Sequence, residues 1–238
     1  MRGAVIAFEG IDGAGKYTQA RLLAERIKEM GLEATIFSYP DYSSPYGTLI
    51  KSFLMKKLEV GAREQAMLYA VDMLKDVDRI SRLTNDGGVV LLDRYFPSII
   101  AYQSAGGAGY GFVTSVVAAA SLVVPDIVIY LDVSVETSLN RTRKRGDDLD
   151  KFEEDRSFLL SVKGFYEKQM RDNVFGVSWV RIDGERPPDI VYHDVIKAVE
   201  HLLGGVKGRL RYTNEVLLSS ELGKYLSRIA GAGGAVDK

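Results

Sequence analysis

A glycine-rich segment near the N-terminus holds the residues best suited to phosphate chemistry. Gly10, Gly15 and Lys16 have the spacing of a P-loop, whose last position is occupied here by Tyr17 instead of serine or threonine. Glycines let the backbone N–H groups point inward, and the start of a helix adds the positive end of a dipole. Lys16 supplies a charge that can reach the terminal phosphates. The sequence therefore predicts a phosphate-binding loop between a strand and a helix.

Tyr17 is a departure at the position that normally offers a small hydroxyl to Mg²⁺. A phenol is bulky and a poor neutral ligand for a hard cation. Thr18 has suitable chemistry, but the next residue of a helix points about 100° further around the axis. We therefore expect an altered P-loop, and the alternative is a chance glycine-rich turn.

A second group of charges follows a fully apolar stretch, 89–92, that we interpret as a buried parallel strand. It ends at Asp93 and Arg94. Charges at the tip of a buried strand are costly unless something polar binds there. This tip should lie beside the phosphate loop, so we expect a ligand contact; a structural ion pair is the alternative.

The densest positive charge of the chain lies at Arg141, Arg143, Lys144 and Arg145, before a glycine and acidic stretch. A basic segment followed by a flexible one is expected of a lid that closes on phosphates. We place this lid at about 141–152. A solvated helix face is the alternative interpretation.

Alternating strands and helices must position these groups. The first strand is expected to begin at Val5, and four further strands are expected at 34–37, 89–92, 127–131 and 177–182. Helices are expected at 15–30, 46–57, 63–83, 98–103, 112–123, 135–144, 152–172 and 187–203. This order predicts an α/β fold, a parallel sheet with helices on both faces and right-handed crossovers. Residues 205–238 are expected to form a helical appendage, whose apolar stripe packs on the domain or a partner subunit, and a flexible tail.

Composition excludes several classes of chemistry. The 238 residues include no cysteine and two histidines, so disulfides and thiol catalysis are excluded and little is left for a histidine-based metal site. The net charge of −1 predicts no nucleic-acid or membrane partner. The sequence has no apolar run long enough to cross a bilayer and no evident signal peptide, so a cytoplasmic protein is expected.

From about residue 4 to residue 203 the chain resembles thymidylate kinase. The resemblance implies a P-loop nucleoside-monophosphate-kinase fold with a five-stranded parallel sheet flanked by helices, a lid, a kinase domain over 1–204 and a homodimer. It rests on motifs that occur in order along the chain: Phe8-Glu9-Gly10-Ile11-Asp12-Gly13-Ala14-Gly15-Lys16 with Thr18-Gln19, Asp93-Arg94-Tyr95, Ser98, Ala101-Tyr102-Gln103, Pro125-Asp126, Tyr130-Leu131-Asp132-Val133, the arginines 141, 143 and 145 with Gly146, and Ile182-Asp183.

The resemblance also implies an activity and roles for residues. The activity is ATP-dependent phosphorylation of dTMP to dTDP by direct in-line transfer, with Mg²⁺ accompanying ATP. Lys16, Arg94, Arg141 and Arg145 are implied as catalytic residues. The implied ATP site comprises Gly10, Asp12, Gly13, Ala14, Gly15, Lys16, Tyr17, Thr18 and Arg143; the implied acceptor site comprises Asp12, Tyr69, Arg94, Ser98, Tyr102 and Gln103; and Asp93 is implied to contact Mg²⁺ through water.

Departures from the family pattern leave two alternatives open. Met73 stands where the family usually has an arginine that touches the thymine edge, which favours a kinase with a broader range of pyrimidine monophosphates. Tyr17 favours a nucleotide-binding protein with weakened catalysis. Tyr42 and Lys151 also replace arginines of the family pattern, and Gly13 and Ala14 lack the P-loop arginine of one branch. The lid arginines would then have to supply the positive charge.

Overall fold

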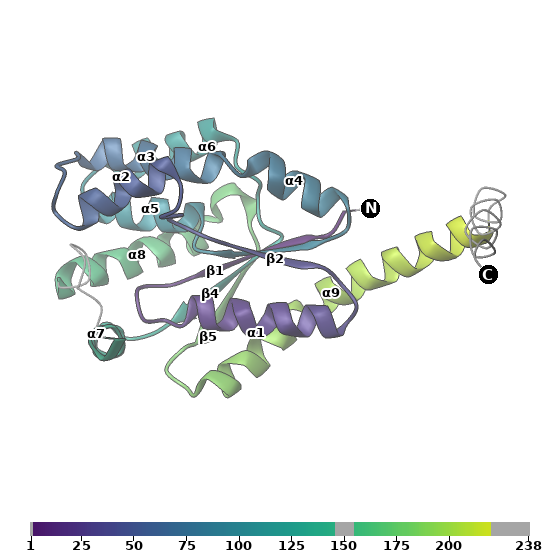
Figure 1. Cartoon of the computed structure of the whole chain (residues 1–238). Helices are drawn as coiled ribbons and strands as arrows, with labels where there is room; N and C mark the ends of the chain where they lie inside the picture. The colour runs from purple at the N-terminus through teal and green to yellow at the C-terminus, as the bar shows by residue number, and fades with distance from the viewer. Residues whose placement is uncertain (1, 146–154, 220–238) are drawn as a thin grey trace, which may run out of the picture.

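The structure, a computed structural model, describes residues 2–145 and 155–219; at 145 and 209–219 only the backbone is described. Its centre is a five-stranded parallel sheet with the order β2-β3-β1-β4-β5 (Figure 1). The strands are β1 Ala4–Glu9, β2 Ala34–Ser38, β3 Val89–Asp93, β4 Ile127–Asp132 and β5 Trp179–Asp183. The predicted parallel α/β sheet is confirmed. The strand that leads into the phosphate loop is the central one.

Helices cover both faces of this sheet (Figure 1). Side chains of β1 alternate between two cores, as the period of two along a strand requires. Ile6 and Phe8 belong to the core formed with α1 and α9, whereas Val5 and Ala7 belong to the one formed with α3, α5 and α6. The α-helices in the described ranges are α1 Lys16–Glu29, α2 Pro45–Leu54, α3 Ala62–Leu74, α4 Val77–Asn85, α5 Phe96–Ala105, α6 Tyr110–Ala120, α7 Val135–Arg145, α8 Arg156–Asp172 and α9 Pro188–Ser219, and a short 3-10 helix, η1 Val174–Gly176, follows α8.

The single helix predicted over 63–83 was wrong, because the chain turns at Lys75 and Asp76 between α3 and α4. The local sequence contains neither glycine nor proline at this turn. Lys75 instead forms ion pairs with Asp41, Asp72 and Asp76, and the turn places its ammonium among them. The helix predicted over 112–123 also ends earlier than expected. α6 ends at Ala120, and the next residue, Ser121, has a φ of 48° in the left-handed region.

The last helix continues past the expected end of the kinase domain. α9 runs without a break through 204 and 205 to Ser219. Val199 and Val206 are both buried in the core that β1 shares with α1. The apolar packing therefore extends beyond the proposed boundary, and the division at 204 remains a prediction. Within the described ranges, no helix is both long and apolar enough to span a membrane.

Candidate active site

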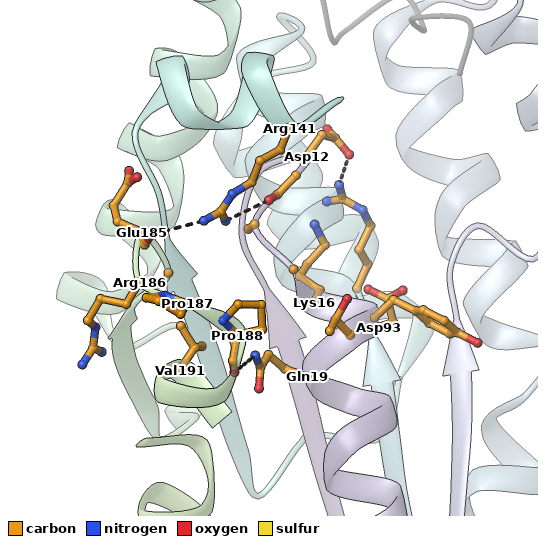
Figure 2. A pocket seen from close by; sticks show the side chains of 17 residues that line it. Asp12, Lys16, Gln19, Asp93, Arg141, Glu185, Arg186, Pro187, Pro188 and Val191 are labelled. Carbon is orange, nitrogen blue, oxygen red and sulfur yellow. Dashed lines mark hydrogen bonds and ion pairs between the residues drawn. The ribbon is translucent and has the colours of Figure 1, made fainter. Parts of the chain in front are cut away.

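The phosphate loop connects β1 to the N-terminus of α1 at the carboxyl edge of the sheet (Figure 2). Gly10 and Gly13 have φ values of 142° and 72°, where L side chains are strained. A Cβ at Gly10 would lie 2.6 Å from the Leu131 carbonyl oxygen, and one at Gly13 would lie 2.9 Å from that of Ser138. Both the conformation and the close approach therefore require glycine at these positions.

A cavity of about 770 Å³, the donor cleft, opens in front of this loop. The 184–188 segment, which leads from β5 into the first residue of α9, forms its opposite wall. A 2.9 Å hydrogen bond from Gln19 Nε2 to the Pro188 carbonyl oxygen attaches this wall to α1. The expected residues Lys16, Tyr17 and Thr18 line it, and Tyr17 is 55% exposed. The donor cleft is lined by residues 12–19, Asp93, Arg94, Arg141, 184–188 and Val191.

Lys16 is buried at the base of the cleft, and its Nζ donates to the Ile11 carbonyl oxygen at 2.9 Å. Burial and the neighbouring charge of Arg94 lower the pKa of Lys16 to about 8. The ammonium is therefore held close to deprotonation until an anion compensates it. A phosphate placed in the loop would raise that pKa and stabilise the charged form.

Arg94, at the tip of β3, forms a partly buried ion pair with Asp12 of the phosphate loop. Arg94 has a φ of 64°, and its guanidinium also donates to the Gly10 carbonyl oxygen at 3.2 Å and to Ser98 Oγ at 3.3 Å. The Tyr102 hydroxyl donates to Asp12 Oδ2 at 2.8 Å. Burial alone would raise the pKa of Asp12, but the charges of Arg94 and Lys16 lower it to about 2. Asp12 is thus a carboxylate at neutral pH.

A second, narrower pocket, the acceptor pocket, begins at this ion pair and extends between α3 and α5. The structure brings together here every residue that the resemblance implied for the acceptor site: Asp12, Tyr69, Arg94, Ser98, Tyr102 and Gln103. Met73 and Leu54 belong to the apolar part of its wall. Asp12 and Arg94 line both pockets, so ligands in the two pockets would meet at this pair.

Comparisons with known proteins agree with this geometry. A family model described as thymidylate kinase matches residues 8–195. The probable thymidylate kinase of Thermococcus kodakarensis is 33% identical over 213 residues, covering 84% of this chain and 98% of the relative. The chain belongs to the thymidylate kinase family. The thymidylate kinase of Caldanaerobacter subterraneus is 32% identical and covers 87% of this chain and 100% of its own length. A solved structure of the Candida albicans thymidylate kinase has the same fold, with a TM-score of 0.70 and 22% identity, and covers 87% of this chain and 94% of that one.

In this family member, a buried carboxylate that we did not assign from the sequence supports the acceptor side. Glu9 is fully buried and accepts hydrogen bonds from Tyr95 N at 2.8 Å, Ser98 Oγ at 2.6 Å and Tyr166 OH at 2.8 Å. Burial raises the pKa of Glu9. The hydrogen bonds that Glu9 accepts from Tyr95 and Ser98 hold the turn after β3 that carries Arg94. The sequence feature that could have identified Glu9 is its position, an acidic residue at the end of the otherwise apolar β1.

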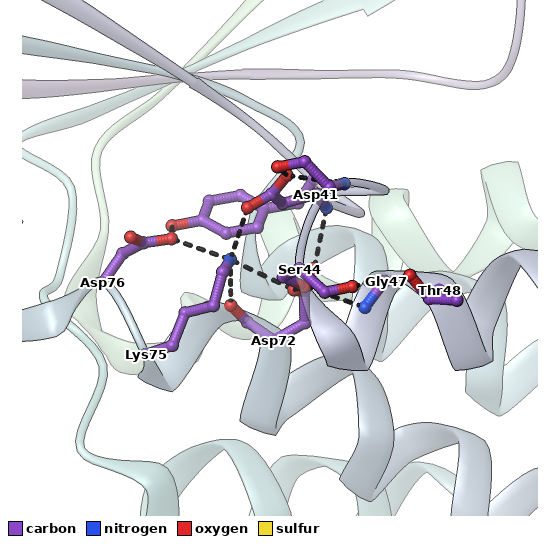
Figure 3. Close-up of polar contacts among 9 residues, drawn as sticks. Asp41, Ser44, Gly47, Thr48, Asp72, Lys75 and Asp76 are labelled. Carbon is purple, nitrogen blue, oxygen red and sulfur yellow. Dashed lines mark hydrogen bonds and ion pairs between the residues drawn. The ribbon is translucent and has the colours of Figure 1, made fainter.

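A polar network, also not assigned from the sequence, fixes the outer wall of the acceptor pocket (Figure 3). Asp72 in α3 is fully buried and accepts from Ser44 Oγ at 2.8 Å and from Asp41 N at 2.9 Å. Lys75 Nζ lies 3.0 Å from Asp72 and 2.8 Å from Asp76. The network attaches the loop that carries Tyr39, Pro40 and Tyr42, all pocket-lining residues, to α3.

The residues expected in the lid have different positions. Arg141, in α7, reaches the donor cleft and donates to the carbonyl oxygens of Gly13 and Glu185, each at 3.3 Å. Arg143 is exposed and is not among the residues that line the donor cleft. The side chain of Arg145, and the predicted lid beyond it including Lys151, lie outside the described residues. Their roles remain predictions.

Proposed function

We propose that this protein transfers the terminal phosphoryl group of ATP directly to dTMP, forming dTDP and ADP. The observation that carries the proposal is that the donor cleft with its phosphate loop and the acceptor pocket share one ion pair, Asp12 with Arg94. Such a junction suits in-line transfer between two phosphates, which requires positioning and charge neutralisation and no covalent nucleophile. Membership of the thymidylate kinase family supports the choice of donor and acceptor.

Different side chains of the two pockets would bind the substrates and neutralise the charge of the phosphates. The N–H groups of the phosphate loop and Lys16 would bind the β- and γ-phosphates of ATP. Arg94 would hold the acceptor phosphate, and Arg141 would add positive charge on the opposite side of the transferred group. Asp12 and Tyr102 would contact the sugar, and Tyr69 would stack on the base. Tyr102 would crowd a ribose 2′-hydroxyl and favour deoxyribose.

Mg²⁺ fits the proposed donor site. This metal usually binds proteins through one or two carboxylates and completes its coordination with water and substrate phosphates. Asp93 offers a carboxylate to the donor cleft, and the cleft is wide enough for waters between them. Among the described residues, no group of three or more acidic or histidine side chains could bind a metal without such help. Bound Mg²⁺ would neutralise charge on the phosphates of ATP.

We also propose a homodimer. Met67, Val71 and Leu74 of α3 are 52%, 36% and 45% exposed and lie at helical spacing, on the side of α3 away from the acceptor pocket. An apolar face of this kind suits a second copy of the chain. Sedimentation equilibrium tests it, and a monomer at micromolar concentration would contradict it. The cytoplasmic location expected from the sequence remains a prediction.

The activity is tested by coupled measurement of ADP release with ATP, Mg²⁺ and dTMP, beside dUMP, UMP and a reaction without acceptor. We expect strong release with dTMP and little with UMP. A clear preference for UMP would overturn the proposal. No release with any acceptor, together with tight ATP binding, would favour the nucleotide-binding protein that Tyr17 suggests.

A further inference from the structure

We infer that the acceptor pocket binds 4-amino pyrimidines as well as 4-oxo pyrimidines, so that dCMP is a second phosphoryl acceptor. The inference rests on the proposed function, because it names a further substrate of the same site. The transfer is otherwise unchanged: an oxygen of the dCMP phosphate attacks the γ-phosphorus of ATP, and the bond from that phosphorus to the β,γ-bridging oxygen breaks. The products are dCDP and ADP, which takes the electron pair of the broken bond.

The charged groups of the acceptor pocket lie at one end. Asp12 and Arg94 are the ionised side chains in its lining, and both also face the donor cleft. The acceptor phosphate belongs at this end, so the base must lie toward the other. The remaining lining side chains are neutral: Tyr39, Pro40, Tyr42, Leu54, Tyr69, Met73, Ser98, Ile99, Tyr102 and Gln103. Within 2–145 and 155–219, no lining residue with a fixed charge is left to read the base.

The hydroxyl groups that line the pocket within the described residues include none that is held as a donor selective for a 4-oxo pyrimidine. Ser98 already donates to Glu9, and Tyr39 already donates to Asp76 at 3.1 Å. Tyr102 donates to Asp12 at the phosphate end. A phenolic hydroxyl, as in Tyr42 and Tyr69, has both a donor and acceptor positions and does not impose one polarity. Among these hydroxyls a base edge therefore meets none that is held as a donor toward it, which is the polarity that would favour O4 over a 4-amino group.

Gln103 is the pocket side chain best placed to read the base. It is 2% exposed, and its Oε1 is buried with no hydrogen-bond partner within the described part of the chain. Buried amide oxygens are costly to leave unpaired, so a ligand group is expected to complete the pairing. The other glutamine buried against α5, Gln169, is anchored by donation to the Pro97 carbonyl at 3.1 Å. The carboxamide of Gln103 has no corresponding anchor among the described residues.

A carboxamide that can rotate by a half-turn about its terminal torsion is complementary to both bases. With thymine or uracil, its oxygen accepts from N3–H and its nitrogen donates to O4. After a half-turn about the terminal torsion, which is broad and roughly two-fold, its nitrogen donates to N3 of cytosine and its oxygen accepts from the 4-amino group. Two hydrogen bonds form in either case at the same positions. Met73 adds no donor that would favour O4 over an amino group.

The test compares dCMP with dUMP, since neither has the 5-methyl group and the two differ only at N3 and at the 4-position. ADP release is measured for both, with dTMP as the reference. We expect kcat/KM for dCMP to lie within about tenfold of that for dUMP, which is less than a site with a fixed donor would impose. A dCMP value more than tenfold below that of dUMP would overturn the inference. If dTMP itself gave no release, the proposed function would fail instead.

Three variants, one at Gln103 and two at Met73, separate recognition of the base from general damage. Gln103→Met keeps the side-chain length and removes both hydrogen bonds, so kcat/KM for dCMP and dUMP should fall together, with their ratio unchanged. A fall in kcat/KM with only one of the two acceptors would contradict a Gln103 carboxamide that binds both bases in two orientations. Met73→Arg adds a fixed donor and should lower the dCMP-to-dUMP ratio at least tenfold, whereas Met73→Leu should leave it unchanged. Thermal unfolding of each variant checks that it folds.

Discussion

The donor cleft and the acceptor pocket meet at Arg94 but are built in different ways. The largest single part of the donor cleft is one continuous segment, residues 12–19. Further lining residues come from 93–94, 141 and 184–191. The acceptor pocket is formed by side chains from five separate parts of the chain, near residues 12, 40, 54, 70 and 100. A continuous segment needs glycines in the right places to keep its shape. An assembled pocket needs buried contacts to hold its parts together, and Asp72 and Glu9 provide them.

This difference predicts how each region fails. In the donor cleft, a change of one charged side chain removes an interaction with phosphate and leaves the scaffold intact. In the acceptor pocket, a residue that never touches the ligand can change its affinity, because it holds a wall in place. The predictions below test this contrast.

Lys16→Ala should have the largest effect. The ammonium group of Lys16 is the positive charge that the phosphate loop contributes to the donor cleft. We expect kcat for ADP release to fall at least about 100-fold, with unchanged thermal unfolding, because positioned charges dominate phosphoryl transfer. Lys28→Ala, at an exposed position of the same helix, is the matched control. Retained activity in Lys16→Ala would overturn the assignment of the phosphate loop.

The pH dependence of ATP capture should be next in size. The pKa of Lys16, lowered to about 8, means that the side chain is charged below that pH and neutral above it. Because kcat/KM reports the free enzyme, kcat/KM for ATP should fall about tenfold per pH unit above pH 8. Bound phosphates raise this pKa, so kcat should begin to fall only at higher pH. Identical profiles for kcat and kcat/KM would contradict this account.

Asp72→Asn should affect the acceptor pocket selectively. The amide group loses the charge that pairs with Lys75 and cannot accept both hydrogen bonds from the loop that starts at Tyr39. We expect KM for dTMP to rise about fivefold, since a hydrogen bond to a charged group contributes about 1.5–3 kcal/mol and only part of it supports binding. KM for ATP should not change. Asp78→Asn, on an exposed position of α4, is the control; equal increases in both KM values would indicate general destabilisation.

Tyr17→Ser should have the smallest effect. The phenol is largely exposed at the rim of the donor cleft, and serine would restore the small hydroxyl of the P-loop pattern. The Mg²⁺ concentration for half-maximal activity should fall by about threefold at most, because a water-bridged contact is nearly as favourable as a direct one. Tyr17→Phe should leave it unchanged. No change with serine would mean that water, Asp93 and the phosphates suffice to hold the metal.

The same contrast explains what the sequence could and could not predict. The phosphate loop of the donor cleft was predictable because its information is local: glycine spacing, a lysine and the adjoining apolar strand all lie within residues 5–16. The buried strands were predictable from continuous apolar runs, and their order along the chain predicted the parallel sheet. Asp93 and Arg94 were identified because charge at the end of such a run is unusual.

The contacts that support the acceptor pocket could not be predicted in this way, although the acid at the end of β1 marked Glu9 as unusual. Asp72 resembles any polar residue on a helix, and its burial follows from the loop at Asp41 that folds over it. The turn at Lys75 depends on the same distant contacts. Glu9 bonds to Ser98 and Tyr166, which are 89 and 157 residues away in sequence. Only the tertiary fold brings these partners together.

The length of α9 has a consequence for the behaviour of the protein in solution. Its 32 residues correspond to a rod of about 48 Å. Its far end extends beyond the sheet and the other helices (Figure 1). A particle with such a projection experiences more hydrodynamic drag than a sphere of the same mass. Sedimentation velocity should therefore give a raised frictional ratio, and a gel-filtration column calibrated with globular standards should overestimate the mass of the protein.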